Sequence, residues 1–227
     1  MIPRPENPLI VALDTSDLDE AERLADVLAP HAAMLKVGLE LAWAYGPDAV
    51  RRIASKGPVF VDAKLHDIPN TVERAAANIA KLGIAMLNVH AMGGEVMMRA
   101  ALEGAARGAD QADVAMPLVV AVTVLSSLSG EELASPASLA WEAKQSGLAG
   151  VVVSGEDVRD VRQVCGDTFC LVVPGVRPSG ANGDDQVRVL TPAGAIERGA
   201  DYLVVGRPIT GSHDPVGVAR GIVLEAR

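Results

Sequence analysis

The stretch that decides the fold is Val59-Phe60-Val61-Asp62-Ala63-Lys64-Leu65-His66-Asp67-Ile68-Pro69-Asn70-Thr71. Its first half is apolar and rich in β-branched residues, which is typical of a strand. Side chains alternate between the two faces of a strand, so Asp62 and Lys64 share one face and the other face is apolar. Acidic and basic side chains are rarely fully buried unless they are paired. The stretch therefore predicts a strand with charges at its C-terminal end, then Asp67, then a helix that starts near Pro69.

Apolar runs of similar length recur along the whole chain and predict further strands. Each is short enough for a strand and is separated from the next by a helical pattern. The eight runs span residues 9–14, 34–38, 59–65, 86–90, 117–125, 150–154, 169–173 and 202–206.

The segments between these runs have apolar residues at helical spacing. The first of them has Asp17 or Ser16 available as its N-cap. The second is expected to be interrupted at Gly46-Pro47. The expected helices span residues 17–29, 43–54, 72–82, 95–106, 136–146, 156–164, 192–198 and 216–226.

Eight strand–helix units in 227 residues predict an α/β protein that forms one (β/α)8 TIM barrel, a single domain over residues 1–227. An open, doubly wound sheet is the alternative. It would be favoured by a glycine-rich fingerprint after the first strand, and Asp14-Thr15-Ser16-Asp17 is not one. No linker or low-complexity tract indicates a second domain.

Composition narrows the class of protein. Hydrophobic residues make up 49% of the chain and aromatic residues only 3%, so Val, Leu, Ile and Ala must build the core. A net charge of -9 argues against binding of nucleic acid or an anionic membrane surface. The longest strongly apolar run, 117–125, is too short to cross a bilayer, and the first residues lack the apolar region of a signal peptide. Cys165 and Cys170 are expected to be core thiols in a reducing compartment, which predicts a cytoplasmic protein.

Polar residues gather where the predicted strands end. In a (β/α)8 barrel these ends meet at one face, and that face carries the active site. From the first strand to the eighth, the residues are Asp14, Lys36, Asp62, Lys64, His90, Ser126, Ser127, Arg177, Gly206 and Arg207.

Asp14, Lys36, Asp62, Lys64 and Asp67 form an alternating set of charges. Unit charges ~4 Å apart interact by roughly 4 kcal/mol at an effective dielectric constant near 20. A lysine between carboxylates would stay protonated and could donate a proton. A carboxylate held there would repel an anionic group of a substrate and favour its loss. The alternative is a structural ion-pair network, which would be costly to desolvate for stability alone.

Gly206-Arg207-Pro208-Ile209 follows the eighth strand, where barrels of this kind often bind phosphate. A free backbone N–H and a guanidinium suit an anion. Arg177 and Gln186, in the preceding loop, could close over the same anion.

The remaining reactive residue types suggest structural roles. His66 and His90 are interpreted as structural or supporting side chains. No group of His, Asp, Glu and Cys has the spacing of a metal site, and no serine lies in a nucleophile elbow.

The motif Asp62-Ala63-Lys64-Leu65-His66-Asp67-Ile68-Pro69-Asn70-Thr71 resembles the signature of the orotidine 5′-monophosphate decarboxylase family. The resemblance covers essentially the whole chain, because other family motifs follow in the same order. These are Ala12-Leu13-Asp14, Lys36-Val37-Gly38, His90-Ala91-Met92-Gly93-Gly94, Pro174-Gly175-Val176-Arg177-Pro178, Asp184-Asp185-Gln186 and Val205-Gly206-Arg207-Pro208-Ile209.

The resemblance implies conversion of orotidine 5′-monophosphate to UMP and carbon dioxide in pyrimidine biosynthesis, without a cofactor or metal, in a homodimer. It implies that Lys64 protonates carbon 6, that Asp62 sits against the substrate carboxylate, and that Asp14 and Lys36 hold the ribose hydroxyls. It also implies that Asp67 and Thr71 complete the partner's site.

The rest of the substrate site also follows from the resemblance. One departure is visible: the family's Thr-Val-Leu-Thr-Ser stands here as Thr123-Val124-Leu125-Ser126-Ser127, with a hydroxyl kept at each position. The phosphate ligands would be Arg177, Gln186, Gly206 and Arg207, and the other contacts with the substrate would come from Ile68, Ser126, Ser127 and Pro174.

Two alternatives stay open. One is a magnesium-dependent sugar-phosphate decarboxylase or aldolase of the same superfamily, which shares Asp-x-Lys-x-x-Asp and works through an enediolate. Ile68-Pro69-Asn70-Thr71 argues against it. The other is a non-catalytic nucleotide-binding regulator, which the intact set of charges argues against.

Overall fold

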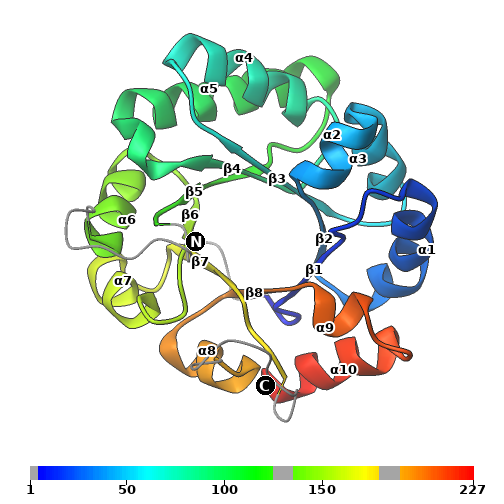
Figure 1. The fold of residues 1–227 in the computed structure, drawn as a ribbon. Coiled ribbons are helices and arrows are strands. Elements are labelled where there is room, and N and C mark those ends of the chain that lie inside the picture. Colours follow the sequence, from blue (N-terminus) through cyan, green and yellow to red (C-terminus); the bar gives the residue numbers. More distant parts are fainter. Residues whose placement is uncertain (1–4, 125–134, 179–189) are drawn as a thin grey trace.

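The computed structural model describes residues 5–124, 135–178 and 190–227. Within these residues eight parallel strands form a closed barrel, in which each strand pairs with the next and β8 pairs with β1 (Figure 1). The predicted α/β class and (β/α)8 architecture are confirmed. The strands are β1 Leu9–Ala12, β2 Met34–Val37, β3 Val59–Leu65, β4 Met86–His90, β5 Leu118–Val122, β6 Gly150–Val152, β7 Cys170–Pro174 and β8 Tyr202–Val205.

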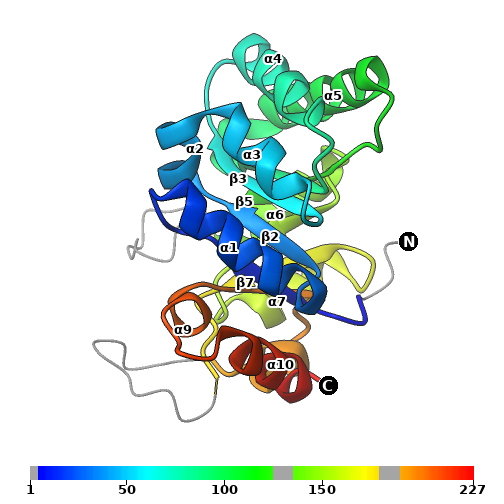
Figure 2. The same cartoon turned by 90° about the vertical axis from the view of Figure 1, so that its right-hand side faces the viewer.

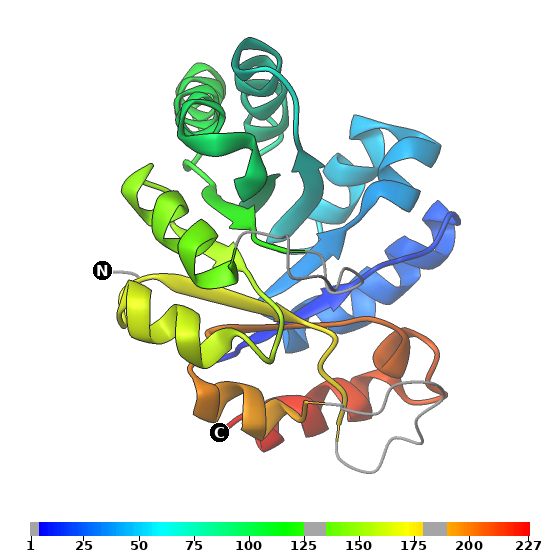
Figure 3. The ribbon, with the colours of Figure 1, turned by 60° about the vertical axis from the view of Figure 1, so that its left-hand side comes forward.

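The helices form a ring outside the barrel (Figure 1), and Figures 2 and 3 show the same helices from two other directions. None in the described segments is both long enough and apolar enough to cross a membrane. They are α1 Leu18–Leu28, α2 Leu39–Tyr45, α3 Pro47–Ala54, α4 Pro69–Ala80, α5 Gly94–Ala112, α6 Pro136–Gln145, α7 Val158–Cys165, α8 Pro192–Arg198, α9 Arg207–Thr210 and α10 Pro215–Glu225, with short 3-10 turns η1 Ala29–His31 and η2 Ala91–Gly93.

Local sequence explains most of the helix boundaries. Asp17 caps α1 by accepting bonds from the N–H groups of Asp19 and Glu20. The expected break at Gly46 separates α2 from α3, with Gly46 at a φ of 63°. Helix α4 starts at Pro69, which confirms the start predicted from Ile68-Pro69 and lies three residues before the range 72–82 given by the apolar spacing. A proline in the first turn lacks only an N–H that the helix would not bond. The helix expected at 95–106 continues to 112, and α9 was not predicted at all.

The core has two layers, one between the barrel and the helices and one inside the barrel. Cys165 and Cys170 are buried free thiols, as expected. Burial raises the pKa of the Cys170 thiol to about 12, and the nearby Asp201 acts in the same direction. The buried apolar residues of the inner layer are Ile10, Ala12, Met34, Phe60, Met86, Val120, Cys170, Val172 and Val204.

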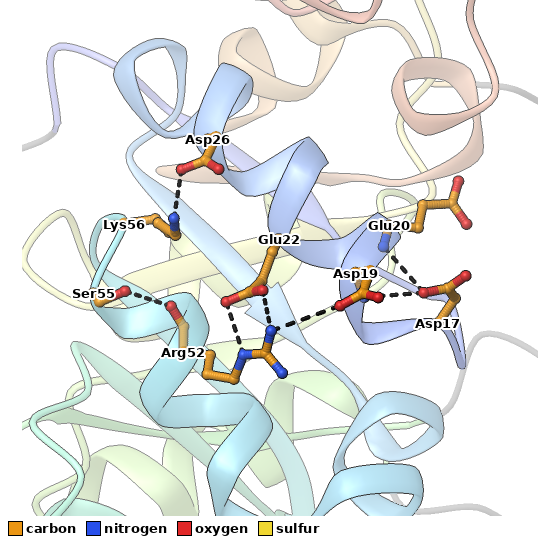
Figure 4. A network of polar contacts seen from close by, with 8 residues as sticks. All are labelled: Asp17, Asp19, Glu20, Glu22, Asp26, Arg52, Ser55 and Lys56. Carbon is orange, nitrogen blue, oxygen red and sulfur yellow. Dashed lines mark hydrogen bonds and ion pairs between the residues drawn. The ribbon is translucent and has the colours of Figure 1, made fainter.

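An ion-pair network joins α1 to α3, the helices next to β1 and β2 (Figure 4). The Arg52 guanidinium donates two hydrogen bonds to the Glu22 carboxylate and lies 3.7 Å from Asp19. Lys56 Nζ lies 2.7 Å from Asp26. The Arg52 hydrogen bond lowers the pKa of Glu22, against the opposing effect of burial. The network ties together two helices that flank strands of the site described below.

Helices α4 and α5 pack unusually closely (Figure 2). A Cβ built on Gly104 would overlap the Glu73 carbonyl oxygen, and a Cβ on Gly108 would overlap the Ala77 carbonyl oxygen. Only glycine allows the two backbones to approach this far. This contact fixes α4, and therefore the segment between β3 and α4.

Gly108→Ala is predicted to lower the free energy of unfolding by about 1–3 kcal/mol, because the added methyl overlaps the backbone of α4. Gly221→Ala is the matched control, since Gly221 lies in α10 with nothing within 4 Å of its built Cβ. That control should gain about 0.5–1 kcal/mol from helix propensity. Urea unfolding followed by circular dichroism measures both. Stabilisation of both variants would contradict the close packing.

Candidate active site

Three neighbouring strands place polar or charged side chains inside the mouth of the barrel. Met34, Phe60 and Met86 point into the apolar interior, so the side chains two residues further on point the same way. These are Lys36 on β2, Asp62 on β3 and Asn88 on β4. Asp14 follows the end of β1 and lies beside Lys36. Ala12 pairs with Lys36, and the Leu13 N–H donates to the Lys36 carbonyl at 3.0 Å, so the two strands stay adjacent up to this point.

The four charged groups form one continuous chain of ion pairs. Lys36 Nζ lies 2.9 Å from Asp14 Oδ1 and 3.2 Å from Asp62 Oδ2. Lys64 Nζ lies 2.6 Å from Asp62 Oδ1. The side chains of Lys36 and Asp62 are 9% and 13% exposed, against 30% for Lys64 and 54% for Asp14. Lys36 is therefore buried and Asp62 mostly buried, and the two ends of the chain open to solvent.

Mutual attraction outweighs burial for the central pair. Burial alone would lower the pKa of Lys36, but Asp62 and Asp14 raise it above the ordinary lysine value. Burial alone would raise the pKa of Asp62, but Lys36 and Lys64, with hydrogen bonds from Lys64 and Asn88, lower it. Asp62 is therefore a carboxylate and Lys36 an ammonium at neutral pH.

Lys64 has an unusual backbone. Its φ is 50°, in the left-handed region, and the pairing of β3 with β4 is irregular between Val61 and Leu65. A non-glycine residue there costs about 1–2 kcal/mol. This turn of the backbone aims the Lys64 ammonium at Asp62, although the regular alternation assumed from the sequence does not continue through Lys64.

Asn88 is the site residue that the sequence analysis missed. Its Oδ1 accepts a bond from the Lys64 N–H at 2.7 Å, and its Nδ2 donates to Asp62 Oδ1 at 2.6 Å. A signal was available, because an amide at the second inward position of the run 86–90 lies on the same face as Met86.

Two glycines lie next to the charged chain, and at Gly38 a side chain would crowd the charges. A Cβ on Gly38 would lie 3.0 Å from Asp14 Oδ1 and 3.1 Å from Lys36 Nζ. A Cβ on Gly206 would lie 3.7 Å from Asp14 Oδ2. Gly206, predicted as a phosphate ligand, therefore lies beside the charged chain, and Arg207 follows it as the exposed first residue of α9.

The other predicted residues lie around this centre. Among the described residues, Asp67 is not part of the ion-pair chain. It is exposed and accepts a bond from the Ile68 N–H at 2.6 Å, and Ile68 and Thr71 are exposed as well. Pro174, which ends β7, and Arg177, whose N–H donates to the Leu190 carbonyl, are half-buried. Predicted residues outside the described segments are Ser126, Ser127 and Gln186.

Fold and side chains together define a (β/α)8-barrel protein with an acid–base site at the C-terminal ends of β1 to β3. In the described segments no three His, Cys, Asp or Glu side chains are arranged to hold a metal ion. What the site presents is a fixed carboxylate beside a partly exposed ammonium, which can destabilise an anionic group and supply a proton.

Comparison with known proteins places the chain in a family. Residues 7–222 match the Orotidine 5'-phosphate decarboxylase / HUMPS family. Proteins named orotidine 5'-phosphate decarboxylase are similar to it: one from Moorella thermoacetica is 47% identical, over 97% of this chain and 92% of that protein. Another, from Nitratidesulfovibrio vulgaris, is 48% identical over 96% of both. The chain therefore belongs to the Orotidine 5'-phosphate decarboxylase / HUMPS family, as the sequence motifs predicted.

Solved structures agree with this assignment. The crystal structure of orotidine 5'-phosphate decarboxylase from Lactobacillus acidophilus matches with a TM-score of 0.84 and 36% identity, over 97% of this chain and 99% of that chain. The structure from Pyrococcus horikoshii, at 24% identity and a TM-score of 0.82, shares the fold.

His90 reports on the charge of the site. Its ring centroid lies 5.4 Å from that of His66. Burial lowers the pKa of His90, and the electrostatic effects of His66 and Lys64 lower it further. Lys64→Ala removes a positive charge and is therefore predicted to raise the pKa of His90, so that the imidazole takes up its proton at a higher pH. NMR titration of the imidazole resonances measures this. A pKa that stays constant or falls would contradict the arrangement.

Proposed function

We propose that this chain is an orotidine 5′-monophosphate decarboxylase, which converts orotidine 5′-monophosphate to UMP and carbon dioxide in pyrimidine biosynthesis. The observation that carries the proposal is the mostly buried Asp62 carboxylate, held between Lys36 and Lys64 in a chain of this family. The curated relatives at 47% and 48% identity are named for this reaction.

The charged chain supplies the groups for the reaction. When the carboxylate of the substrate lies against Asp62, the two negative charges repel each other, and loss of carbon dioxide relieves the repulsion. The bond from carbon 6 to the carboxylate breaks, and its electron pair stays on carbon 6. The Lys64 ammonium stabilises this developing negative charge and then transfers its proton to carbon 6. Solvent reprotonates Lys64, whose side chain is 30% exposed.

The rest of the site binds the nucleotide. Asp14 and Lys36 are at the right end of the chain to hold ribose hydroxyls, because Asp14 is open to solvent and Gly206 lies beside it. Gly206, Arg207 and Arg177 bind the phosphate, with Gln186 from outside the described segments. Ile68, Ser126, Ser127 and Pro174 complete the contacts with the substrate. Phosphate binding away from the reacting carbon contributes energy for positioning.

The magnesium-dependent sugar-phosphate enzyme is the second candidate. The comparisons do not favour it, since the relatives at 44–48% identity are named orotidine 5'-phosphate decarboxylase. The two candidates differ in their response to a chelator.

The purified protein is expected to turn over orotidine 5′-monophosphate in EDTA, measured as loss of the orotate absorbance. Lys64→Ala should lower kcat by about 10²–10⁴-fold, because the proton donor is lost while the protein stays folded. Lys81→Ala, an exposed lysine at the end of α4, is the control and should keep wild-type turnover. Absence of turnover by the wild-type protein would overturn the proposal.

We also propose a homodimer in which Asp67 and Thr71 complete the partner's site. Both are exposed, and Asp67 lies outside the ion-pair chain of its own protomer. The neighbouring Ile68 is 65% exposed, and Met92 and Val96, after the adjacent strand β4, are 52% and 70% exposed. Exposed apolar side chains near the rim of a site suit an interface.

Mixing inactive Asp62→Ala and Asp67→Ala protomers tests the shared site. In each heterodimer one site carries both substitutions and the other carries neither. Random pairing should therefore restore about a quarter of the wild-type activity. No recovery in verified heterodimers would contradict the arrangement.

We further propose that the protein is cytoplasmic and that residues 1–227 form a single domain. Buried free thiols at Cys165 and Cys170 support a reducing compartment such as the cytoplasm. The closed barrel, which uses strands from β1 to β8, supports a single domain over residues 1–227.

A further inference from the structure

Asn88 is a neutral side chain built into the charged centre. It lies in the middle of β4 and is 0% exposed. Its two ends bond to two different functional residues, the backbone of Lys64 at 2.7 Å and the carboxylate of Asp62 at 2.6 Å. A buried amide with both ends engaged in this way constrains both partners.

The chemistry of the partners fixes the orientation of the amide. The Lys64 N–H is a donor and needs an oxygen opposite it. The Asp62 carboxylate is an acceptor and needs an N–H. The reversed amide would set donor against donor and acceptor against acceptor, so the orientation follows from the network.

The backbone of Lys64 depends on this bond. Because β3 and β4 lose regular register between Val61 and Leu65, the Lys64 N–H bonds to a side chain instead of a strand carbonyl. The same residue has its φ at 50°, a conformation that persists only where the surroundings enforce it. Asn88 is the surrounding group that holds the N–H.

We propose that Asn88 is a positioning residue for the decarboxylation, which fixes the left-handed backbone of Lys64 and the Asp62 carboxylate so that ammonium and carboxylate keep one relative position. The inference rests on the proposed function. Asn88 does not itself touch the reacting atoms. It links the residue that donates the proton to the residue that repels the leaving group.

The inference predicts a loss in the chemical step with little change in binding. Asn88→Leu keeps the branched shape of the side chain but removes both hydrogen bonds. Displacement of the proton donor by about 1 Å lowers a rate by about 10²-fold, so kcat should fall by that order. KM and the dissociation constant of UMP should stay within about twofold of the wild type, because Gly206 and Arg207 are unchanged.

Val120→Ala is the matched control. Val120 lies opposite Asn88 in the register of β4 and β5 and is also 0% exposed. This substitution loosens the same part of the barrel interior but leaves both bonds of Asn88 in place. It should lower stability and leave kcat within about twofold of the wild type.

Asn88→Asp provides a second readout, the pH dependence of kcat, which a loss of packing alone would not change. The new carboxyl can accept from the Lys64 N–H in either state, but it can donate to Asp62 only when it is protonated. The ratio of its kcat to that of the wild type should therefore rise as the pH falls, whereas Asn88→Leu should show no such rise. The groups that face the new carboxyl are Asp62 and Lys64 on β3, Lys36 on β2 behind Asp62, His90 further along β4, and the apolar Val120 on β5.

The wild-type protein must first turn over orotidine 5′-monophosphate, which tests the proposed function separately. A fall in kcat for Asn88→Leu, absent in Val120→Ala, together with the rise for Asn88→Asp at low pH, supports the inference. A kcat for Asn88→Leu no lower than that of Val120→Ala overturns it. If Asn88→Leu does not fold, Asn88→Asp decides the question. The inference is then overturned if the ratio of the Asn88→Asp kcat to the wild-type kcat stays constant or decreases as the pH is lowered.

Discussion

The Asp62 carboxylate is held by two ammonium groups and one amide, and the arrangement of the site follows from this contact. Lys36 approaches one oxygen at 3.2 Å, and Lys64 and Asn88 approach the other at 2.6 Å each. Burial works against the charge, but the attraction of the two lysines keeps the pKa of Asp62 low. The protein therefore holds a negative charge in a place where an isolated carboxylate would take up a proton.

The barrel makes this contact possible because three adjacent strands deliver the partners. Met34, Phe60 and Met86 form an apolar floor, and Lys36, Asp62 and Asn88 stand one inward position above it. An apolar floor has a low dielectric constant, which strengthens the interactions between the charges above it. Helices around the barrel fix the strands: the Arg52 network ties α1 to α3, and glycines bring α5 against α4. The same fold thus positions the buried centre and the exposed segment that starts with Asp67.

Much of this could be predicted from the sequence. Alternation in the run 59–65 put Asp62 on an inward face, and the periodic pattern of runs and helices indicated the closed barrel. Charged residues at strand ends identified Asp14, Lys36, Asp62 and Lys64, and the structure brings these four into contact.

What could not be predicted has physical causes. Lys64 adopts a left-handed backbone without being a glycine, so no local signal marks it, and tertiary bonding to Asn88 enforces it. A polar residue such as Asn88 inside an apolar run is easily taken for a minor interruption.

The carboxyl ¹³C chemical shift of Asp62 tests the central claim most directly. The unliganded protein is titrated from about pH 7 to about pH 3, and Asp62→Asn identifies the resonance. The ordinary pKa of aspartate is about 3.9. The account predicts that the titration midpoint of Asp62 lies below this value, because the two lysines stabilise the ionised form. A midpoint at or above the ordinary value would mean that burial outweighs the two lysines, and it would contradict the account.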